Sequence, residues 1–188
     1  VHYEKDASYE EVMNEEKVQA IKKSQRRFKN QFLPQSLLTH CGAEQAFNYH
    51  YLRVLRIAVH PQYQGLGIGR YLLNQINDYG QERGFHYVGA SFGAHKALLS
   101  FWLTAGYKLM RIGFTKDSAS GEHSALVLKS LKDLKNIKDT KEEGRVIDNS
   151  DDMLNHLQQL FVRTFDYLLT DEYQRLPESL ITLILAYN

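Results

Sequence analysis

The sequence predicts an α/β protein in which helices flank a mixed β-sheet and a small α-helical appendage follows at the C-terminus. Four runs rich in β-branched, aromatic and leucine residues read as strands: 53–59, 87–92, 107–114 and 123–128. Between the first three runs, apolar residues recur at helical spacing over 68–79 and 97–105. Such alternation of strands and helices is typical of a layered α/β structure.

Glycine and proline residues set the limits of the predicted helices. Residues 9–27 can form a charged helix with only a thin apolar stripe. Pro34 suits the first turn of a second helix, and Gly42 suits its end. Gly84 and Gly106 follow the two helices of the α/β layer, at positions where a glycine cap commonly ends a helix.

A charged stretch poor in apolar residues, 132–149, reads as a linker. Ser150 and the two aspartates after it favour a helix start, because they can cap and charge-match the first turn. A last helix is predicted over 178–187. We therefore expect an α/β module at 1–131, the linker, and a helical tail at 150–188.

Composition limits the classes of function. The 188 residues are 43% hydrophobic and carry a formal charge of +1, so net charge indicates no polyanionic partner. Cys41 is the only cysteine, which excludes an intrachain disulfide. No apolar run reaches the ~20 residues of a membrane span, and the polar start is not a signal peptide. We expect a cytoplasmic protein with no membrane partner and no metal site and, because the first residue is Val1, a fragment or a processed chain.

Three glycines at alternate positions, Gly65, Gly67 and Gly69, follow the first predicted strand and precede a helix. Glycine lets the backbone approach a ligand closely, and the free N–H groups of a first helical turn attract anions. The spacing matches neither the dinucleotide fingerprint nor the triphosphate loop. The sequence therefore predicts an anion site at this loop, with a tight turn that binds no ligand as the alternative.

The pattern Gln64-x-x-Gly67-x-Gly69, placed after Val-His-Pro, resembles the acetyl-CoA pyrophosphate loop of the GCN5-related N-acetyltransferases (GNAT). The resemblance implies a GNAT-like sheet with acetyl-CoA as cofactor. The strand end would pair with the pantetheine arm, and an amide near Val59 would polarise the thioester carbonyl. The cofactor-binding residues it implies are Ile57, Ala58, Val59, Gln64, Gly65, Leu66, Gly67, Ile68, Gly69 and Arg70.

Further segments occur in the order found in the RNA cytidine acetyltransferases, and with the glycine loop they resemble that family over roughly 31–128. They are ASFGA at 90–94, LLSFW at 98–102, AGY at 105–107 and SGEHSA at 120–125. The resemblance implies acetylation of the exocyclic N4 amine of a cytidine in RNA, which in the bacterial branch is the wobble cytidine of tRNA(Met).

The same resemblance implies a larger enzyme. This family uses a module that hydrolyses ATP (or GTP), and the chain has no Gly-x-x-x-x-Gly-Lys-Ser/Thr loop. The first strands of a GNAT sheet are also expected upstream of Val1. We therefore interpret 1–131 as the acetyltransferase module of a longer protein, with an N-terminal ATPase module of that protein as its partner.

The reaction implied by the resemblance needs acid/base residues, and the sequence offers three candidates for them. Many GNAT enzymes carry a tyrosine on the helix after the second core strand as the acid, and here the matching position is Trp102, which has no phenolic proton. His123 and Glu122 are candidates because they end the loop that borders the last strands, and histidine titrates near neutrality. Ser91 could hydrogen-bond the thiolate. A structural loop histidine and a capping serine are the alternatives.

A basic cluster near the N-terminus could contact RNA phosphates, or could be a solvated helix face. Its members are Lys22, Lys23, Arg26, Arg27 and Lys29. The partner would be tRNA or another structured RNA. Two other functions stay open: a GNAT enzyme that acetylates an amine of a small molecule or a protein, and a non-catalytic module that binds acetyl-CoA or RNA.

Overall fold

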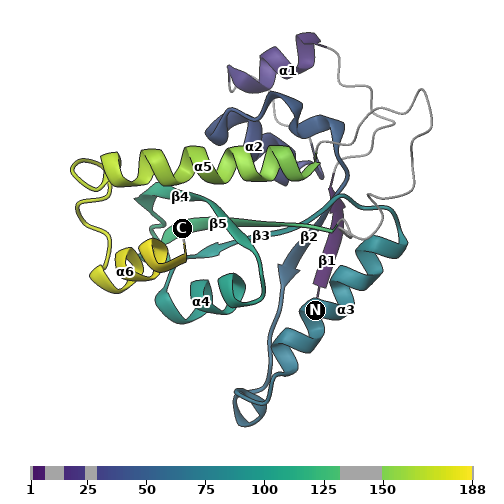
Figure 1. The fold of residues 1–188 in the computed structure, drawn as a ribbon, viewed down its shortest axis with the longest axis vertical. Helices are drawn as coiled ribbons and strands as arrows, with labels where there is room; N and C mark the ends of the chain where they lie inside the picture. The colour runs from purple at the N-terminus through teal and green to yellow at the C-terminus, as the bar shows by residue number, and fades with distance from the viewer. Residues whose placement is uncertain (1, 7–14, 24–28, 132–149, 188) are drawn as a thin grey trace.

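The computed structural model describes residues 2–6, 15–23, 29–131 and 150–187. At its centre is a five-stranded mixed sheet in the order β1-β2-β3-β5-β4, in which β2 and β3 run parallel and the other neighbours antiparallel (Figure 1). The strands are β1 (His2–Asp6), β2 (Tyr51–Arg56), β3 (Tyr87–Gly93), β4 (Lys108–Lys116) and β5 (His123–Ser130). With helices on its two faces, this sheet confirms the predicted fold class.

Six α-helices and two 3-10 turns connect the described strands. The helices are α1 (Glu15–Lys22), α2 (Phe32–Cys41), α3 (Ile68–Glu82), α4 (Lys96–Thr104), α5 (Ser150–Leu168) and α6 (Glu178–Tyr187). The short turns are η1 (Glu44–Asn48) and η2 (Pro61–Tyr63). The predicted helices after residue 31 are all present. Of the helix predicted at 9–27, only the part at α1 lies within the described residues.

Alternate residues of each strand face opposite sides of the sheet, and each side has its own core. On one side, Leu52 and Val88 pack with buried residues of α3, α4 and α6. On the other side, Tyr51 and Tyr87 pack with α2 and the first turns of α5. The second half of α5 reaches the first core through Phe161 and Phe165. The C-terminal helices therefore contribute to both cores.

The helical tail is fastened to the outer strand β4. The Tyr173 hydroxyl, in the turn between α5 and α6, donates a hydrogen bond of 2.7 Å to the backbone carbonyl of Ile112. Lys108 donates to the side-chain carbonyl of Asn155 at 2.8 Å. The predicted linker at 132–149 lies outside the described residues, and the division into module, linker and tail stays a prediction.

Strand β1 was not indicated by the sequence pattern. Its residues His2–Asp6 include one apolar side chain, Tyr3, so they lack the alternation that marks a half-buried strand. It is a strand because it pairs with β2. The pairing is antiparallel and runs from Asp6–Tyr51 to His2–Arg56. The charged composition suits an outer strand, which has a neighbour on only one side in this sheet.

The sheet opens between β2 and β3, and this opening positions the site. The two parallel strands pair only at their first residues, Tyr51–Tyr87, Leu52–Val88 and Arg53–Gly89. Beyond this, β2 pairs with β1, β3 pairs with β5, and the carboxyl ends diverge (Figure 1). The strand predicted at 53–59 ends at Arg56. Residues 57–59 therefore continue without ladder partners, and this part of the prediction is wrong.

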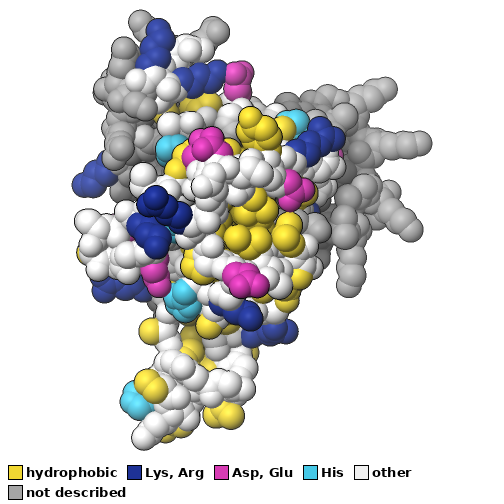
Figure 2. All heavy atoms as spheres, turned by 90° about the vertical axis from the view of Figure 1, so that its left-hand side faces the viewer, with side chains coloured by type: hydrophobic (Ala, Val, Ile, Leu, Met, Phe, Trp, Pro, Cys, Tyr) yellow, Lys and Arg dark blue, Asp and Glu magenta, His cyan; other side chains and the backbone are white. Residues whose placement is uncertain are grey.

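The chain after β2 projects from the body as a long loop, at the lower end of Figure 1 and Figure 2. Exposed hydrophobic side chains lie along it, among them Tyr63 and Leu66, and Tyr71 follows in the first turns of α3. Within the part of the chain that the structure describes, no helix is long and apolar enough to cross a membrane.

Candidate functional site

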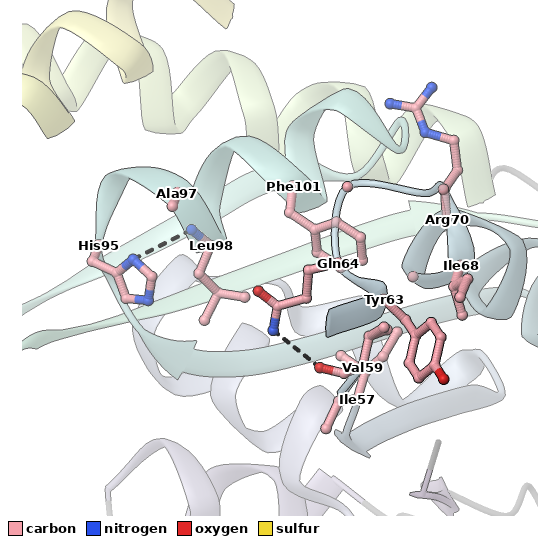
Figure 3. Close-up of a pocket in the computed structure, with 14 residues that line it drawn as sticks. Ile57, Val59, Tyr63, Gln64, Ile68, Arg70, His95, Ala97, Leu98 and Phe101 are labelled. Atoms are coloured by element: carbon pink, nitrogen blue, oxygen red, sulfur yellow. Dashed lines mark hydrogen bonds between the residues drawn. The ribbon is translucent and has the colours of Figure 1, made fainter. Parts of the chain in front are cut away.

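A pocket of about 700 Å³ lies where β2 and β3 diverge (Figure 3). Three segments wall it: the end of β2, the glycine loop with the first turn of α3, and the first half of α4. Its residues are Ile57, Ala58, Val59, Tyr63, Gln64, Gly65, Gly67, Ile68, Gly69, Arg70, His95, Ala97, Leu98 and Phe101. The volume is in the range of sites for small molecules and cofactors.

The glycines of the loop serve two different purposes. Gly65 and Gly67 both have φ +81°, in the left-handed region that favours glycine. Gly69 has ordinary backbone angles, but a Cβ atom there would lie 3.0 Å from Cε2 of Phe101. The first two glycines therefore permit the turn, and the third lets α3 approach α4.

The N-terminus of α3 offers unpaired donors to the pocket. Gly67 is the N-cap residue, and no side chain caps this helix. The N–H of Tyr71 is the first to bond back, to the Gly67 carbonyl at 2.9 Å. The amides before it therefore point out of the helix with the positive end of its dipole. Arg70 adds an exposed guanidinium in the same turn.

Two side chains brace the loop from within. Gln64 donates from Nε2 to the Val59 carbonyl at 3.0 Å (Figure 3), and the His60 ring accepts from the Gln62 amide at 3.4 Å. The second contact supports a role in the turn for His60. The first uses the carbonyl of Val59, so backbone pairing with a ligand at this residue is left to its amide.

Nine of the ten residues predicted to bind the cofactor line this pocket. The exception is Leu66, which lies in the same loop with 71% of its surface exposed. The α4 wall was not predicted, because Leu98 and Phe101 were used only as apolar positions that mark a helix. Their spacing of three residues marks one helix face but does not say whether that face meets the core or a cavity.

His95 is a pocket residue that the sequence did not single out. It is the N-cap of α4, and its Nδ1 accepts a hydrogen bond from the Leu98 amide at 3.3 Å (Figure 3). Since Nδ1 is the acceptor here, the proton of the neutral ring lies on Nε2. In this tautomer His95 presents its Nε2–H to the pocket as a hydrogen-bond donor.

The three predicted catalytic residues lie beside the pocket and do not line it. Ser91 is on β3 opposite Leu126 of β5, while Glu122 and His123 stand at the start of β5. The chain from β3 to α4 joins the two places. The Ala94 amide donates to the His123 carbonyl at 2.6 Å, and the next residue, His95, lines the pocket.

His123 is buried, with 5% of its surface exposed, and its hydrogen bond determines its tautomer. Its Nδ1 lies 2.8 Å from the Gly113 carbonyl oxygen. A carbonyl only accepts, so Nδ1 carries the proton and Nε2 of the neutral ring has a free lone pair. Nε2 is buried without a hydrogen-bond partner among the described residues. The arrangement has the form of an oriented base.

Glu122 lies against the last residue of β3. A Cβ atom on Gly93 would lie 1.9 Å from Oε2 of Glu122, so the carboxylate packs directly on the glycine. The backbone of Glu122 is held by the loop before it: its amide bonds to the Ser120 hydroxyl at 3.3 Å, and its carbonyl accepts from Asp117 at 2.9 Å. The structure thus gathers Glu122 and His123 at one end of the β3–β5 pair.

Helix α4 contains no tyrosine, so no phenol of this helix replaces the proton donor that Trp102 cannot supply. Trp102 is buried and stacks on Phe92, with 5.6 Å between ring centroids and 13° between planes. The nearby Tyr107 hydroxyl bonds to Oδ1 of Asn77 at 3.0 Å, and burial raises the pKa of Tyr107 above its usual range. Both side chains are part of the core.

The predicted RNA-binding cluster is only partly described. Lys22 forms an ion pair with Glu44, while Lys23 and Lys29 are exposed. Arg26 and Arg27 lie outside the described residues. The role of the cluster stays a prediction, with one of its charges already paired inside the chain.

Known proteins were compared with the chain. The family model of GNAT acetyltransferase 2 matches residues 5–85 and 81–132. The tRNA(Met) cytidine acetyltransferase TmcA of Nitrosococcus halophilus (strain Nc4) is 39% identical over 117 residues, which is 62% of this chain and 16% of that protein. TmcA of Haemophilus influenzae is 32% identical over 120 residues, 64% and 18% respectively. The chain thus spans less than a fifth of the length of these relatives.

Among solved structures, the ribosomal-protein-S18-alanine N-acetyltransferase from Escherichia coli aligns with a TM-score of 0.41 at 20% identity. The alignment covers 51% of this chain and 60% of that one. This likeness is too distant to carry a functional argument. The family match, by contrast, includes the open sheet, the glycine loop and the β3–β5 pair. The chain belongs to the GNAT acetyltransferase 2 family, and its module is that of an acyltransferase.

Proposed function

We propose that this chain is the acetyltransferase module of a larger enzyme: it binds acetyl-CoA in the pocket between β2 and β3, and within that enzyme it acetylates the N4 amine of a cytidine in tRNA. The observation that carries this proposal is the uncapped, glycine-led N-terminus of α3 at the mouth of the pocket. The two relatives named as tRNA(Met) cytidine acetyltransferases supply the substrate class. The wobble cytidine of tRNA(Met) is the position we propose.

The residues present fit acetyl-CoA. The uncapped amides of the first α3 turn and Arg70 would hold the pyrophosphate. The unpaired chain at 57–59 and the apolar side chains of Leu98 and Phe101 would hold the pantetheine arm. His95 offers a hydrogen bond from Nε2. When bound, acetyl-CoA supplies an acetyl group activated as a thioester.

The acceptor amine needs a base, because its lone pair is delocalised into the cytosine ring and its proton becomes acidic only during attack. We assign the base to His123. Nε2 would take the proton from the amine, and the Gly113 carbonyl would keep the ring oriented through Nδ1–H. Nδ1–H stays bonded to the Gly113 carbonyl in the imidazolium that results. Since Nε2 is buried, the amine reaches it only when the residues around it move.

The whole enzyme would be longer than this chain, since its relatives are more than five times the matched length. We propose that a module that hydrolyses ATP or GTP, in the same protein, cooperates with the acetyltransferase module in the cytoplasm. A flipped cytidine must be unstacked and held at the site, which costs a few kcal/mol. We propose that the further module helps to unstack the cytidine and to hold the RNA at the site.

The test is mass spectrometry of nucleosides from tRNA of cells with and without the gene. We expect N4-acetylcytidine to disappear from tRNA(Met) in the deletion strain and to return when the gene is restored. Unchanged acetylcytidine in the deletion strain would contradict the proposal. The acceptor would then be an amine of a small molecule or a protein, or the module would bind acetyl-CoA or RNA without catalysis.

A further inference from the structure

The pocket between β2 and β3 has an apolar edge that is open to solvent. Tyr63, in η2, and Ile68, the first residue of α3, both line the pocket and have 55% and 37% of their surfaces exposed. In Figure 3 they lie toward one end of the drawn residues, while His95 and Ala97 of α4 lie toward the other. Exposed apolar side chains that gather at one place mark ligand sites or interfaces, whereas single ones are normal.

The backbone holds Tyr63 at this edge. Its amide donates to the His60 carbonyl at 2.8 Å, and the next amide, that of Gln64, donates to the Pro61 carbonyl at 3.2 Å. The rings of His60 and Tyr63 are 5.9 Å apart between centroids, with 56° between their planes. The phenol ring is therefore presented on a hydrogen-bonded turn, so a ligand that covers it has little backbone to order.

The shape of acetyl-CoA determines which of its parts can reach Tyr63. In the proposed function, the pyrophosphate lies at the uncapped amides of the first α3 turn. The pantetheine arm runs from there along residues 57–59 and the α4 wall, toward the opening of the sheet. The adenosine is attached to the other side of the pyrophosphate. It therefore extends outward, over the loop that carries Tyr63 and projects from the body (Figure 1).

We propose that Tyr63 is the stacking platform for the adenine of acetyl-CoA and that Ile68 extends this platform. The inference rests on the proposed cofactor. Aromatic side chains bind nucleobases by stacking, because every base has a π-face. A nucleotide combines a pyrophosphate with a flat aromatic group, which matches free amides and an exposed ring within one loop. Tyr63 would thus select coenzyme A over an acetyl carrier that ends at phosphopantetheine.

The experiment is calorimetry with the full-length protein and two ligands. Acetyl-CoA carries the adenosine, and S-acetyl-4′-phosphopantetheine lacks it. The variants are Tyr63→Ala, Tyr63→Phe and Tyr71→Ala. Tyr63→Phe keeps the ring. Tyr71→Ala is the matched control, because Tyr71 is 61% exposed, lies in the first turns of α3 and is not among the pocket residues. The melting temperature of each variant checks that it is folded.

We expect Tyr63→Ala to raise the Kd for acetyl-CoA roughly 10-fold, which is within the range for losing one base–aromatic stack. The same substitution should change the Kd for S-acetyl-4′-phosphopantetheine by less than about twofold, because that ligand has no base to stack. Tyr63→Phe should retain the wild-type Kd for both ligands, since its ring can still stack. Tyr71→Ala should retain both values as well.

Two results would overturn the stacking role. Equal losses for the two ligands would show that the substitution disturbs the loop. Unchanged affinity of folded Tyr63→Ala for acetyl-CoA would show that the ring is left for another partner, such as a further segment of the longer protein.

Failure of the proposed function is visible separately. A folded wild type that binds no acetyl-CoA would overturn the proposed cofactor together with the stacking role. If the wild type binds acetyl-CoA but tRNA of the deletion strain keeps its acetylcytidine, only the proposed reaction is wrong. The stacking role is then still decided by the Kd values of the two ligands.

Discussion

Gly67 combines two properties in one residue of the cofactor loop. Its φ of +81° needs glycine, and as N-cap of α3 it stands beside the free amides. We predict that Gly67→Glu abolishes binding of acetyl-CoA, because a strained backbone and a negative charge would occupy the proposed pyrophosphate position. Isothermal titration calorimetry with the folded variant measures this.

Gly84 provides the matched control for this substitution. It also has a positive φ, +72°, and a Cβ atom there would meet nothing within 4 Å. It follows the other end of α3, away from the pocket. Gly84→Glu therefore adds the same charge and a similar strain without touching the loop, and should keep its affinity. Unchanged affinity in folded Gly67→Glu would refute the assignment of the loop.

His123 is the residue on which the proposed proton transfer depends. We predict that His123→Ala lowers turnover on tRNA by roughly 10²-fold in the full-length protein, which is a common cost of losing a general base. His123→Asn is the control for a structural role, because its amide can still donate to the Gly113 carbonyl.

Turnover of His123→Ala within a few-fold of the wild type would reassign His123 to a structural role. The acetyl-CoA affinity of both variants should match the wild type, since His123 is not among the pocket residues. A loss of affinity equal to the loss of turnover would point to a disturbed fold.

Among the elements, those with strong apolar periodicity were predictable. The helices α3 and α4 and the strands β3 to β5 repeat apolar residues at their own spacing, so local pattern and tertiary position agree. Strand β1 was not predictable, and neither was the end of β2 at Arg56. Both depend on pairing between residues about fifty positions apart. A local pattern contains no information about such a partner.

The candidate site also has features that the sequence predicts and features that it does not. The glycine loop was predictable, since positive φ and a helix start leave a signature in the sequence. The capping bond that turns His95 towards the pocket, and the contact of Glu122 with Gly93, arise only when β3, β5 and α4 come together. Leu66 is absent from the pocket lining, and its predicted contact with the cofactor stays a prediction.

The tail helices complete the edge of the sheet. Strand β4 is an outer strand, and the Tyr173 hydroxyl satisfies the carbonyl of Ile112 on its open side. We predict that Tyr173→Phe lowers the free energy of unfolding by about 1 kcal/mol, the typical cost of leaving a buried carbonyl unpaired. Urea unfolding of the chain measures this.

The control is Tyr167→Phe, because Tyr167 is in α5 but has 76% of its surface exposed. Removing its hydroxyl should change the free energy of unfolding by less than about 0.5 kcal/mol. Equal effects of the two substitutions would show that the bond to Ile112 does not fasten the tail. Neither residue lines the pocket, so the affinity for acetyl-CoA should stay the same in both variants.

For the whole molecule, the chain contains the pocket between β2 and β3 but only a small part of the length of its relatives. We predict that the isolated chain binds acetyl-CoA but does not acetylate tRNA. The three walls of the pocket lie within described residues, so we expect cofactor binding to survive in the isolated chain. Its predicted basic cluster is small, and Lys22 is already paired with Glu44. Such a cluster supplies some attraction to phosphates but cannot position a folded RNA.

The measurement compares the isolated chain with the full-length protein, each incubated with acetyl-CoA, ATP and unmodified tRNA(Met). Acetylcytidine should form only with the full-length protein, while calorimetry should show acetyl-CoA binding to both. Comparable acetylcytidine from the two would show that the module alone positions the RNA. A loop that binds through its own backbone amides should hold the cofactor in the isolated chain. Absence of cofactor binding to the isolated, folded chain would contradict this prediction and would show that the pocket between β2 and β3 depends on further segments.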